Sequence, residues 1–437
     1  MNLVMPTVPS FPKTRIQIAG ISVEDLVQEF GTPTFVYDAK KIIERINDLQ
    51  AFDVVRYAQK ANSNLAVLNL VRRQGALVDT VSAGEIHRAL RVGYETVGDP
   101  PPIIYTADIF DRESLKLCVE RNIHVNCGSP DMIDQLGERA PGREITLRIN
   151  PGFGHGHSQK TNTGGEQSKH GIWHEQVKQC VARAEQCGLQ VTGLHLHIGS
   201  GTDLVHLSQV CQAMERLGDE VGSTIRTISA GGGLPIPYQE GESYIDLSVY
   251  YELWDAARKR LENSFGHPVR LEIEPGRYVV GESGFLITEI RAVKQMGSNT
   301  YYLVDAGFNN LARPILYGSH HPMSIALTPA DGGSRPMRNV VVGGPLCESG
   351  DIFTQSEGGF VRKHSLPEAR VGEFLLIECV GAYGFVMSSN YNSQPMAAEV
   401  LIHDGKSHLV RRRQTADDMI QGELLAQFRS TEENLKY

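Results

Sequence analysis

The chain has 437 residues, with 42 Lys and Arg against 51 Asp and Glu, and a formal net charge of −9. Hydrophobic residues make up 41% of the chain and charged residues 21%, a balance that excludes a disordered or low-complexity protein. An acidic chain without basic runs is also a poor candidate for binding nucleic acid or an anionic membrane surface.

The N-terminal residues MNLVMPTVPSFPK lack the apolar core of a secretion signal, and no apolar run approaches the roughly 18 residues of a membrane span. The seven cysteines are odd in number and form no CxxC pair. These features predict a reduced cytoplasmic protein in which most thiols are small buried hydrophobic groups. The length allows two or three domains.

The first predicted element is a strand in TRIQIAG (14–20), which we expect to join a β-domain, and a short helix follows in residues 21–30. Eight short runs of β-forming residues then alternate with amphipathic helical patterns. The β runs cover residues 53–59, 76–82, 103–107, 124–127, 145–150, 191–199, 227–233 and 269–276. The clearest helical patterns cover residues 65–75, 84–93 and 243–265.

Strand–helix alternation repeated eight times is typical of a (β/α)8 TIM-like barrel, an α/β fold that we place at residues 35–284. An open doubly wound sheet is the alternative, but no GxGxxG motif follows the first strand. Between the fifth and sixth strands, the Gly-, Ser-, Thr- and His-rich segment 150–172 predicts a long polar loop. Such a loop would lie at the C-terminal end of the barrel and face the substrate.

The pattern changes after Gly284, where β runs follow one another without long helices between them. These runs cover residues 286–293, 300–306, 338–344, 373–378, 397–403 and 407–412. They predict an all-β domain, a small barrel or sandwich, built from residues 285–437 together with residues 1–34. We expect this domain to complete the active site and the dimer interface.

Unusual residues gather where the predicted barrel strands end. Lys60 follows the first strand, so its side chain would point into the barrel mouth, although a lysine at such a junction is more often an ordinary surface residue. The sixth strand ends in HLHIGSG, whose histidines His195 and His197 share one face of the strand. An HxH pair can bind zinc in barrel hydrolases, but the later strand ends carry glycines and a glutamate. We therefore expect no metal.

The seventh and eighth strands end in AGGG (230–233) and EPGR (274–277). Consecutive glycines expose backbone N–H groups and allow an anion to approach closely, as at phosphate sites after late barrel strands. A turn before a helix would explain the glycines equally well if they stood alone. EPGR adds a carboxylate, a further glycine amide and an arginine, so the two neighbouring loops together favour a phosphate site.

A lysine, a phosphate cradle, a histidine and a carboxylate at one barrel mouth predict a pyridoxal 5′-phosphate site. Lys60 would link to the cofactor, while the glycine amides and Ser200 would hold its phosphate. His197 would lie against the ring, and Glu274 would keep the ring nitrogen protonated through a charge-assisted hydrogen bond. A protonated ring is a strong electron acceptor, which favours decarboxylation over racemisation.

The predicted β-domain carries a second set of candidate residues. Arg313 and Tyr317 are four residues apart, so a helical turn would present both to a substrate carboxylate. Cys347 and Glu348 pair a proton donor with a carboxylate that could bind an amino group. The ordinary interpretations are a turn at Arg-Pro and a cysteine in the core.

The motifs YAQKAN, DTVSAGE, HLHIGS, AGGG, EPGR, RPILY, GPLCESGD and GAYG occur in that order. Together they resemble the barrel-type pyridoxal-phosphate-dependent amino-acid decarboxylases of the alanine-racemase-like fold, and among them the diaminopimelate decarboxylase family. The resemblance runs from about Pro33 to Arg412. It implies decarboxylation of meso-2,6-diaminopimelate at its D-centre, which yields L-lysine and CO2 in the last step of lysine biosynthesis.

The resemblance also assigns roles to individual residues. It implies that the cofactor is held by Lys60, His197, Ser200, Gly233, Glu274, Gly276, Arg277 and Tyr383. It implies that the substrate is bound by Arg277, Arg313, Tyr317, Glu348 and Tyr383. The catalytic residues would be Lys60, His197 and Cys347, with Lys60 or Cys347 as the acid that protonates Cα. Cys347 and Glu348 would come from the neighbouring subunit of a homodimer.

Two other functions remain open from the sequence. A related decarboxylase could act on ornithine, arginine, a D-amino acid such as D-lysine, or a siderophore or antibiotic intermediate, with the same cofactor residues. His170, where the family often has Phe, lies near the substrate loop and leaves this substrate question open. A non-catalytic pyridoxal-phosphate carrier would not need Cys347, Glu348 or the Arg313–Tyr317 pair, so their presence favours an enzyme.

Overall fold

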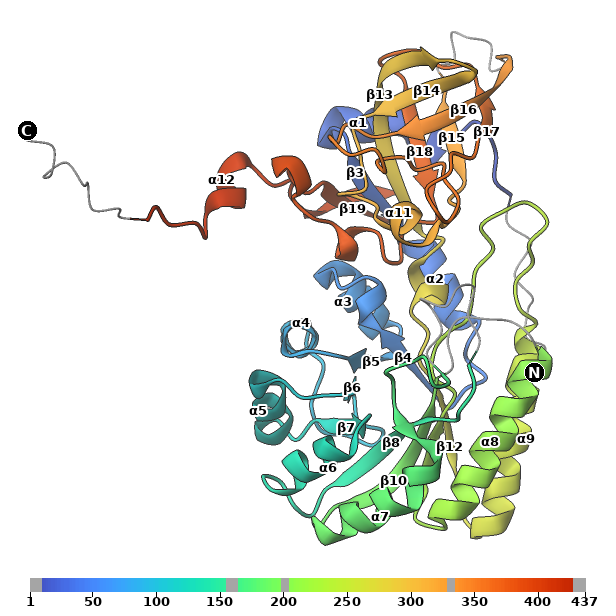
Figure 1. Ribbon diagram of the computed structural model, residues 1–437, viewed down its shortest axis with the longest axis vertical. Helices are drawn as coiled ribbons and strands as arrows, with labels where there is room; N and C mark the ends of the chain where they lie inside the picture. Colours follow the sequence, from blue (N-terminus) through green and yellow to red (C-terminus); the bar gives the residue numbers. More distant parts are fainter. Residues whose placement is uncertain (1–9, 155–163, 198–203, 328–334, 427–437) are drawn as a thin grey trace, which may run out of the picture.

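The structure is a computed structural model that describes residues 10–154, 164–197, 204–327 and 335–426 (Figure 1). Its larger part is a closed barrel of parallel strands, in which β8 also pairs with β10 and so joins the two ends of the sheet. The strands are β4 (Val54–Ala58), β5 (Leu77–Thr80), β6 (Ile103–Ala107), β7 (His124–Cys127), β8 (Glu144–Asn150), β10 (Gln190–Leu196), β11 (Thr227–Ser229) and β12 (Arg270–Ile273). The eight predicted runs and the closed barrel are confirmed. A short ninth strand, β9 (Ile172–Trp173), pairs with β8.

Helices cover the outside of the barrel, and the residues at their starts explain where each begins. The helices are α2 (Ala39–Asn47), α3 (Leu65–Arg73), α4 (Ala83–Arg91), α5 (Arg112–Glu120), α6 (Pro130–Gly137), α7 (Val177–Gln186), α8 (Leu204–Val221) and α9 (Leu247–Phe265). Ser82 accepts a hydrogen bond from the N–H of Glu85, and Asp111 accepts one from Ser114, so each side chain caps the helix that follows its strand. No helix in the described part of the chain is both long and apolar enough to cross a membrane.

The interior of the barrel is unusually polar, because charged and hydroxyl side chains stand where branched aliphatic residues are common. Arg56 forms two hydrogen bonds of 2.6 and 2.9 Å with the carboxylate of Glu272, and both side chains are buried. One layer away, Asn126 donates to Thr106 over 2.9 Å. Polar groups therefore continue through the barrel to the strand ends at its mouth.

The smaller part is an all-β unit, as the sequence predicts. Its strands are β3 (Thr34–Asp38), β13 (Gly284–Met296), β14 (Asn299–Val304), β15 (Met323–Ala326), β16 (Met337–Gly343), β17 (His364–Pro367), β18 (Phe374–Glu378), β19 (Ala398–His403) and β20 (Lys406–Arg411). All six predicted runs form strands, and β3, β15 and β17 are additional. The unit also carries the helices α11 (Arg313–Tyr317) and α12 (Ala416–Ile420).

The N-terminal region departs from the sequence expectation. The strand expected in residues 14–20 does not join the large sheet: β1 (Gln17–Ile18) pairs only with β2 (Ile21–Ser22), ahead of α1 (Val23–Phe30). The reason lies at Ala19 and Gly20, whose φ angles of 46° and 87° turn the chain back on itself. An isolated β-bridge from Thr14 to Ile325, and two hydrogen bonds of 2.9 Å from Arg15 to Glu378, link this segment to the β unit.

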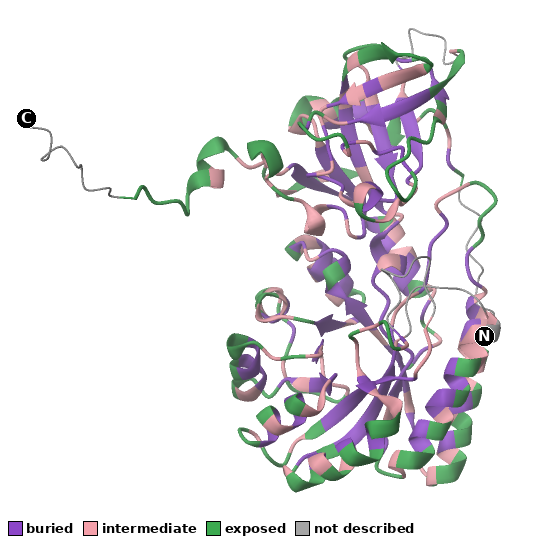
Figure 2. Ribbon diagram, viewed as in Figure 1, coloured by how far each residue is buried: buried purple, intermediate pink, exposed green. Residues whose placement is uncertain are grey.

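β3 lies between β13 and β19 in the second sheet. A domain boundary at residue 35 therefore falls inside a strand that belongs wholly to that sheet. Figure 2 shows buried residues concentrated in the strands of both parts, with exposed residues on the outer helices. The two parts meet near the barrel mouth, where Gly381 packs so closely that a Cβ atom would lie 1.8 Å from the carbonyl oxygen of Val280.

Candidate active site

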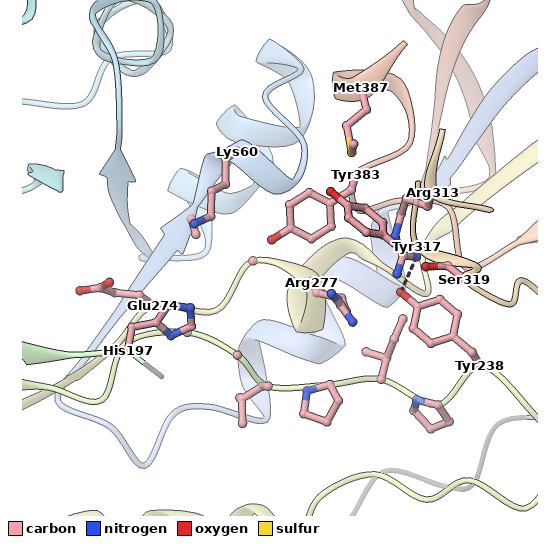
Figure 3. A pocket seen from close by; sticks show the side chains of 18 of the residues that line it. Lys60, His197, Tyr238, Glu274, Arg277, Arg313, Tyr317, Ser319, Tyr383 and Met387 are labelled. Carbon is pink, nitrogen blue, oxygen red and sulfur yellow. Dashed lines mark hydrogen bonds between the residues drawn. The ribbon is translucent and has the colours of Figure 1, made fainter. Parts of the chain in front are cut away.

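A cavity of about 780 Å³ opens at the C-terminal end of the barrel and is lined by both parts of the protein (Figure 3). The structure brings together most of the residues that the sequence singles out. The predicted residues in its wall are Lys60, His197, Gly233, Glu274, Gly276, Arg277, Arg313, Tyr317 and Tyr383. Ser200 lies outside the described residues.

Lys60 stands in a 3-10 turn, Gln59–Ala61, that directly follows β4. Gln59 and Ala61 are buried and fix the turn, and the carbonyl of Ala61 accepts a hydrogen bond of 2.8 Å from the N–H of Tyr383. The side chain of Lys60 points into the cavity (Figure 3) and forms no hydrogen bond or ion pair with any described residue. A lysine fixed at its backbone and free at its amino group can react with a ligand.

Glu274 follows β12 and is buried at the cavity floor. Its Oε1 accepts a hydrogen bond of 2.8 Å from Ser229, and its Oε2 lies 3.0 Å from Nε2 of His195. Burial opposes ionisation, but the charge and hydrogen bonding of His195, the hydroxyl of Ser229 and the charge of Arg56 outweigh it. They hold the pKa of Glu274 at about 2. The floor of the cavity therefore carries a fixed negative charge.

Asp79, on β5, also lines the cavity and was not singled out by the sequence analysis. It is 5% exposed, and its Oδ1 atom is buried without a hydrogen-bond partner in the described structure. Burial and the negative charge of Glu274 raise the pKa of Asp79 to about 8, against the opposing charge of Lys60. At neutral pH the carboxyl group of Glu274 is thus ionised while that of Asp79 keeps its proton, a difference between neighbouring carboxyl groups that is common in active sites.

The raised pKa of Asp79 predicts a change in how stability depends on pH. Unfolded Asp79 loses its proton above about pH 4, while the folded group keeps it up to about pH 8, so this group lowers stability as pH rises between those values. Asp79→Asn removes the effect. As pH rises, the free energy of unfolding of the variant should therefore increase relative to that of the native protein, by up to about 1.4 kcal/mol for each pH unit. Denaturant unfolding of both ligand-free proteins at several pH values measures this difference. A constant difference from pH 4 to pH 8 would contradict the assignment.

The predicted glycines have separate structural tasks. A Cβ on Gly231 would lie 2.5 Å from the carbonyl oxygen of Leu196, and one on Gly232 would lie 2.5 Å from that of Glu274. These two glycines therefore allow neighbouring strand ends to pack closely. Gly233, with a φ of 98°, turns the chain along the cavity wall. Gly232 and Gly233 of the AGGG segment both line the cavity, where the anion cradle stays a prediction.

His197 and Tyr383 line the wall between the cavity floor and the second unit. Burial, and then the charges of Arg148 and Lys60, lower the pKa of His197 well below its usual value, so its ring is neutral. Tyr383 has a φ of 57°, a left-handed conformation that a bulky residue adopts only when its surroundings impose it. Both rings present flat faces suited to packing against a planar ligand.

Arg313 and Tyr317 lie on one helical turn, α11, and both reach the cavity, as predicted. Arg313 is only 6% exposed, donates to the hydroxyl of Tyr238 over 3.1 Å, and lies 3.0 Å from Nε2 of His321. No described carboxylate forms an ion pair with Arg313 or with Arg277. Arg313 is buried and Arg277 half-buried, and cations in such places without an acidic partner favour an anionic ligand.

Cys347 and Glu348 do not line the cavity of their own chain. Cys347 is the exposed cysteine, and its backbone N–H donates to Asn392. The other cysteines are buried or half-buried, as expected. The described part of loop 150–172 also stays out of the cavity wall, residues 155–163 lie outside the described part, and His170 binds Asp108 over 2.7 Å instead.

Several cavity residues were missed because no local signal marks them. Arg148, Thr106 and Tyr238 lie inside strands or in a loop of ordinary composition, and only closure of the barrel brings them to the cavity. Their period-two position on inward faces of strands could have indicated the first two.

Comparison with known proteins agrees with this geometry. The family model for "Pyridoxal-dependent decarboxylase, pyridoxal binding domain" matches residues 39–281. The diaminopimelate decarboxylase of Escherichia coli (strain K12) is 54% identical over 411 residues, which are 93% of this chain and 97% of that protein. A crystal structure of a diaminopimelate decarboxylase matches with a TM-score of 0.89 and 53% identity, covering 93% of this chain and 98% of the other. The Helicobacter pylori diaminopimelate decarboxylase complexed with L-lysine matches with a TM-score of 0.79 and 30% identity, covering 91% and 98%.

Proposed function

The chain belongs to the diaminopimelate decarboxylase family of pyridoxal-dependent decarboxylases, and we propose that its cavity converts meso-2,6-diaminopimelate to L-lysine and CO2. The observation that carries this substrate is the pair Arg277 and Arg313, cations in the cavity wall without a carboxylate partner in the described structure. Diaminopimelate has an amino-acid group at each end. One end can lie at Lys60 while the carboxylate of the other binds these arginines across the cavity (Figure 3).

The residues of the cavity fit pyridoxal phosphate. Lys60 offers a free amino group, and Gly276 lines the cavity and packs closely against the lysine turn, since a Cβ there would lie 3.1 Å from Cβ of Ala61 and 3.2 Å from the carbonyl oxygen of Ala58. Glu274 is ionised, so its carboxylate can accept a hydrogen bond from a protonated ring nitrogen. The residues that would hold the cofactor are Lys60, His197, Gly233, Glu274, Gly276, Arg277 and Tyr383.

Bound pyridoxal phosphate supplies an electron-accepting ring that takes up the electron pair left when CO2 departs. The chain's own residues do the rest. Arg313 and Tyr317 fix the distal end of the substrate, so only one of its two centres lies beside Lys60. A docked D-centre explains why one end alone would lose its carboxylate. Lys60, which would lie next to that centre, can donate the proton that replaces the departed carboxylate at Cα.

We place Cys347 and Glu348 in the active site of a second copy of the chain. Both stand outside their own cavity, and Cys347 is exposed, which supports delivery to a partner. Glu348 would bind the distal ammonium group of the substrate, and Cys347 would be the alternative proton donor at Cα. The working form would then be a homodimer with shared sites.

We also propose that the protein is cytoplasmic. The seven cysteines of the chain are all free, which suits a reducing compartment.

A CO2-release assay tests the substrate. We expect the pyridoxal-phosphate-loaded protein to release CO2 from meso-diaminopimelate at a kcat/KM at least about 100-fold above those for ornithine, arginine and D-lysine, because these lack the distal carboxylate. Ornithine or arginine as the better substrate would contradict the proposal, and so would bound cofactor without CO2 release.

Hybrid dimers test the shared site. Lys60→Ala and Cys347→Ala proteins should each be inactive or nearly so, and mixing them after dissociation should restore up to about a quarter of native activity. Half of the randomly mixed dimers are hybrids, and each hybrid has one intact site. Exchange of subunits is checked separately, by native mass spectrometry of the mixture with one of the two variants isotope-labelled. Complete exchange without any rescue would show that Cys347 acts within its own chain.

A further inference from the structure

The carboxylate of Glu274 is fixed from two neighbouring strands. His195 on β10 pairs in register with Ser229 on β11, and Ser229 pairs with Glu272 on β12. Glu274 stands two residues beyond Glu272 and so emerges on the same inward side. The register of three parallel strands therefore places an imidazole, a hydroxyl and a carboxylate together beneath the cavity.

The protons of this group can be counted. The hydroxyl oxygen of Ser229 accepts a hydrogen bond of 3.1 Å from the N–H of Gly231, so its single proton is left to donate to Glu274. The N–H of Glu274 in turn donates to the carbonyl of Gly231 over 2.8 Å. Ser229 is thus fixed as a donor, and a donor at Oε1 requires that this oxygen carry no proton.

His195 approaches the other oxygen. Its ring is 2% exposed, and Nε2 lies 3.0 Å from Oε2, although the N–H does not point straight along this line. His195 therefore acts on Glu274 chiefly through electrostatics, and the burial of both groups reduces screening of that interaction by water. Gly231 makes the approach possible, since a Cβ there would lie 3.2 Å from Nε2 of His195.

We propose that His195 is a positioning residue that, with Ser229, keeps Glu274 ionised and aimed at the ring nitrogen of pyridoxal phosphate. This inference rests on the proposed function, because it concerns the same cofactor site. His195 lines the cavity, but in this assignment it acts through Glu274 and not on substrate or cofactor directly. A protonated Glu274 would repel a protonated ring nitrogen through its own hydrogen, and the electron-accepting power of the ring would fall.

The balance of effects on Glu274 agrees with this role. Burial favours the neutral acid, and His195 is the largest of the influences that reverse it, ahead of Ser229 and Arg56. Removing His195 therefore raises the pKa of Glu274. The effect of removing His195 should appear first at acidic pH, where Glu274 begins to take up a proton.

The test uses the holoenzyme with His195→Phe, which keeps a flat ring but removes both nitrogens. We expect kcat to fall about tenfold or more while KM for meso-diaminopimelate changes less than about twofold. Independently of activity, the variant should lose its cofactor faster as pH falls from about 7 to about 5, measured by the decay of visible absorbance after dilution. The native rate should change much less over this range.

Two further variants keep the result interpretable. His195→Gln, whose amide N–H can still donate to the carboxylate, should recover part of both losses, and Ser229→Ala should show the same acid-side loss more weakly. His124→Phe is the matched control, because His124 is another barrel imidazole, bound to Thr146 over 2.9 Å with no recorded contact to Glu274. It should leave the pH dependence of cofactor loss unchanged.

The outcomes separate this inference from the proposed function. A native pH dependence of cofactor loss in His195→Phe, or an equal change in His124→Phe, would overturn the role of His195. Failure of the proposed function would instead appear as native holoenzyme that releases no CO2 from meso-diaminopimelate. Cofactor loss needs no substrate, so the two failures cannot be confused.

Discussion

Replacing Lys60 with alanine is expected to abolish the visible absorbance of the lysine-bound cofactor and to lower CO2 release by at least about 10⁴-fold. Lys60 is the free amino group that points into the cavity from the end of β4. A free lysine has a pKa near 10.4 and is almost wholly charged at neutral pH. The hydrogen bond between Ala61 and Tyr383 fixes the turn that carries Lys60. No other described lysine lines the cavity, so none can replace Lys60.

Absorbance spectra and the CO2 assay measure this result. Lys178→Ala, at an exposed position on α7, is the matched control and should keep both properties. Because Lys60 is itself accessible through the cavity and makes no hydrogen bond, its removal should leave the fold intact, which circular dichroism can check. A yellow and active Lys60→Ala protein would refute the cofactor assignment.

Local patterns made much of the fold predictable. Each barrel strand is a short run of β-forming residues, and several, such as β5 and β6, are followed closely by a helix with a capping side chain at its start. β3, β15 and β17 were not among the predicted runs, and β17 ends in a proline, which weakens a strand pattern. The turn at Ala19 and Gly20 was missed because it depends on two φ angles rather than on hydrophobic pattern.

The site was predictable where function requires an unusual residue at a strand end. Lys60, Glu274 and Gly233 all stand at such ends. The sequence placed His195 beside His197, but it could not reveal that His195 faces Glu274. That contact joins strands separated by β11 and depends on the barrel register. Asp79 was missed for the same reason. Its raised pKa comes from burial and from the charge of Glu274, a residue far along the chain that only the closed barrel brings near.

The second large effect is expected at Arg313. Its neighbours are neutral hydrogen-bond acceptors. Nδ1 of His321 donates to the carbonyl of Glu378, so Nε2 of the same ring is the acceptor that faces the guanidinium of Arg313. Burial, and then the charge of Arg313, hold the pKa of His321 well below its usual value, which keeps that ring neutral. The hydroxyl of Tyr238 accepts a hydrogen bond from the same guanidinium nitrogen that faces His321, and the ring of Tyr238 lies 5.2 Å from the guanidinium carbon. Neutral partners fix Arg313 in place but do not neutralise it.

Arg313→Leu should therefore cost about 2–5 kcal/mol of binding to the distal carboxylate, or roughly a 30- to 5000-fold fall in kcat/KM for meso-diaminopimelate, mostly through KM. Arg313→Lys should recover only part of the loss, because an ammonium group lacks the planar fork that matches a carboxylate. Arg338→Leu, which breaks an exposed pair with Glu368, is the control and should stay near native.

D-Lysine makes the measurement specific, because it presents the same reacting centre without a distal carboxylate. Its kcat/KM, already low in the native protein, should change only a few fold in Arg313→Leu. The preference for diaminopimelate over D-lysine should then collapse by nearly the whole factor lost on diaminopimelate. An equal loss on both substrates would mean that Arg313 supports the shape of the cavity and does not read the distal carboxylate. A loss on diaminopimelate alone would identify Arg313 as the residue that selects a substrate charged at both ends.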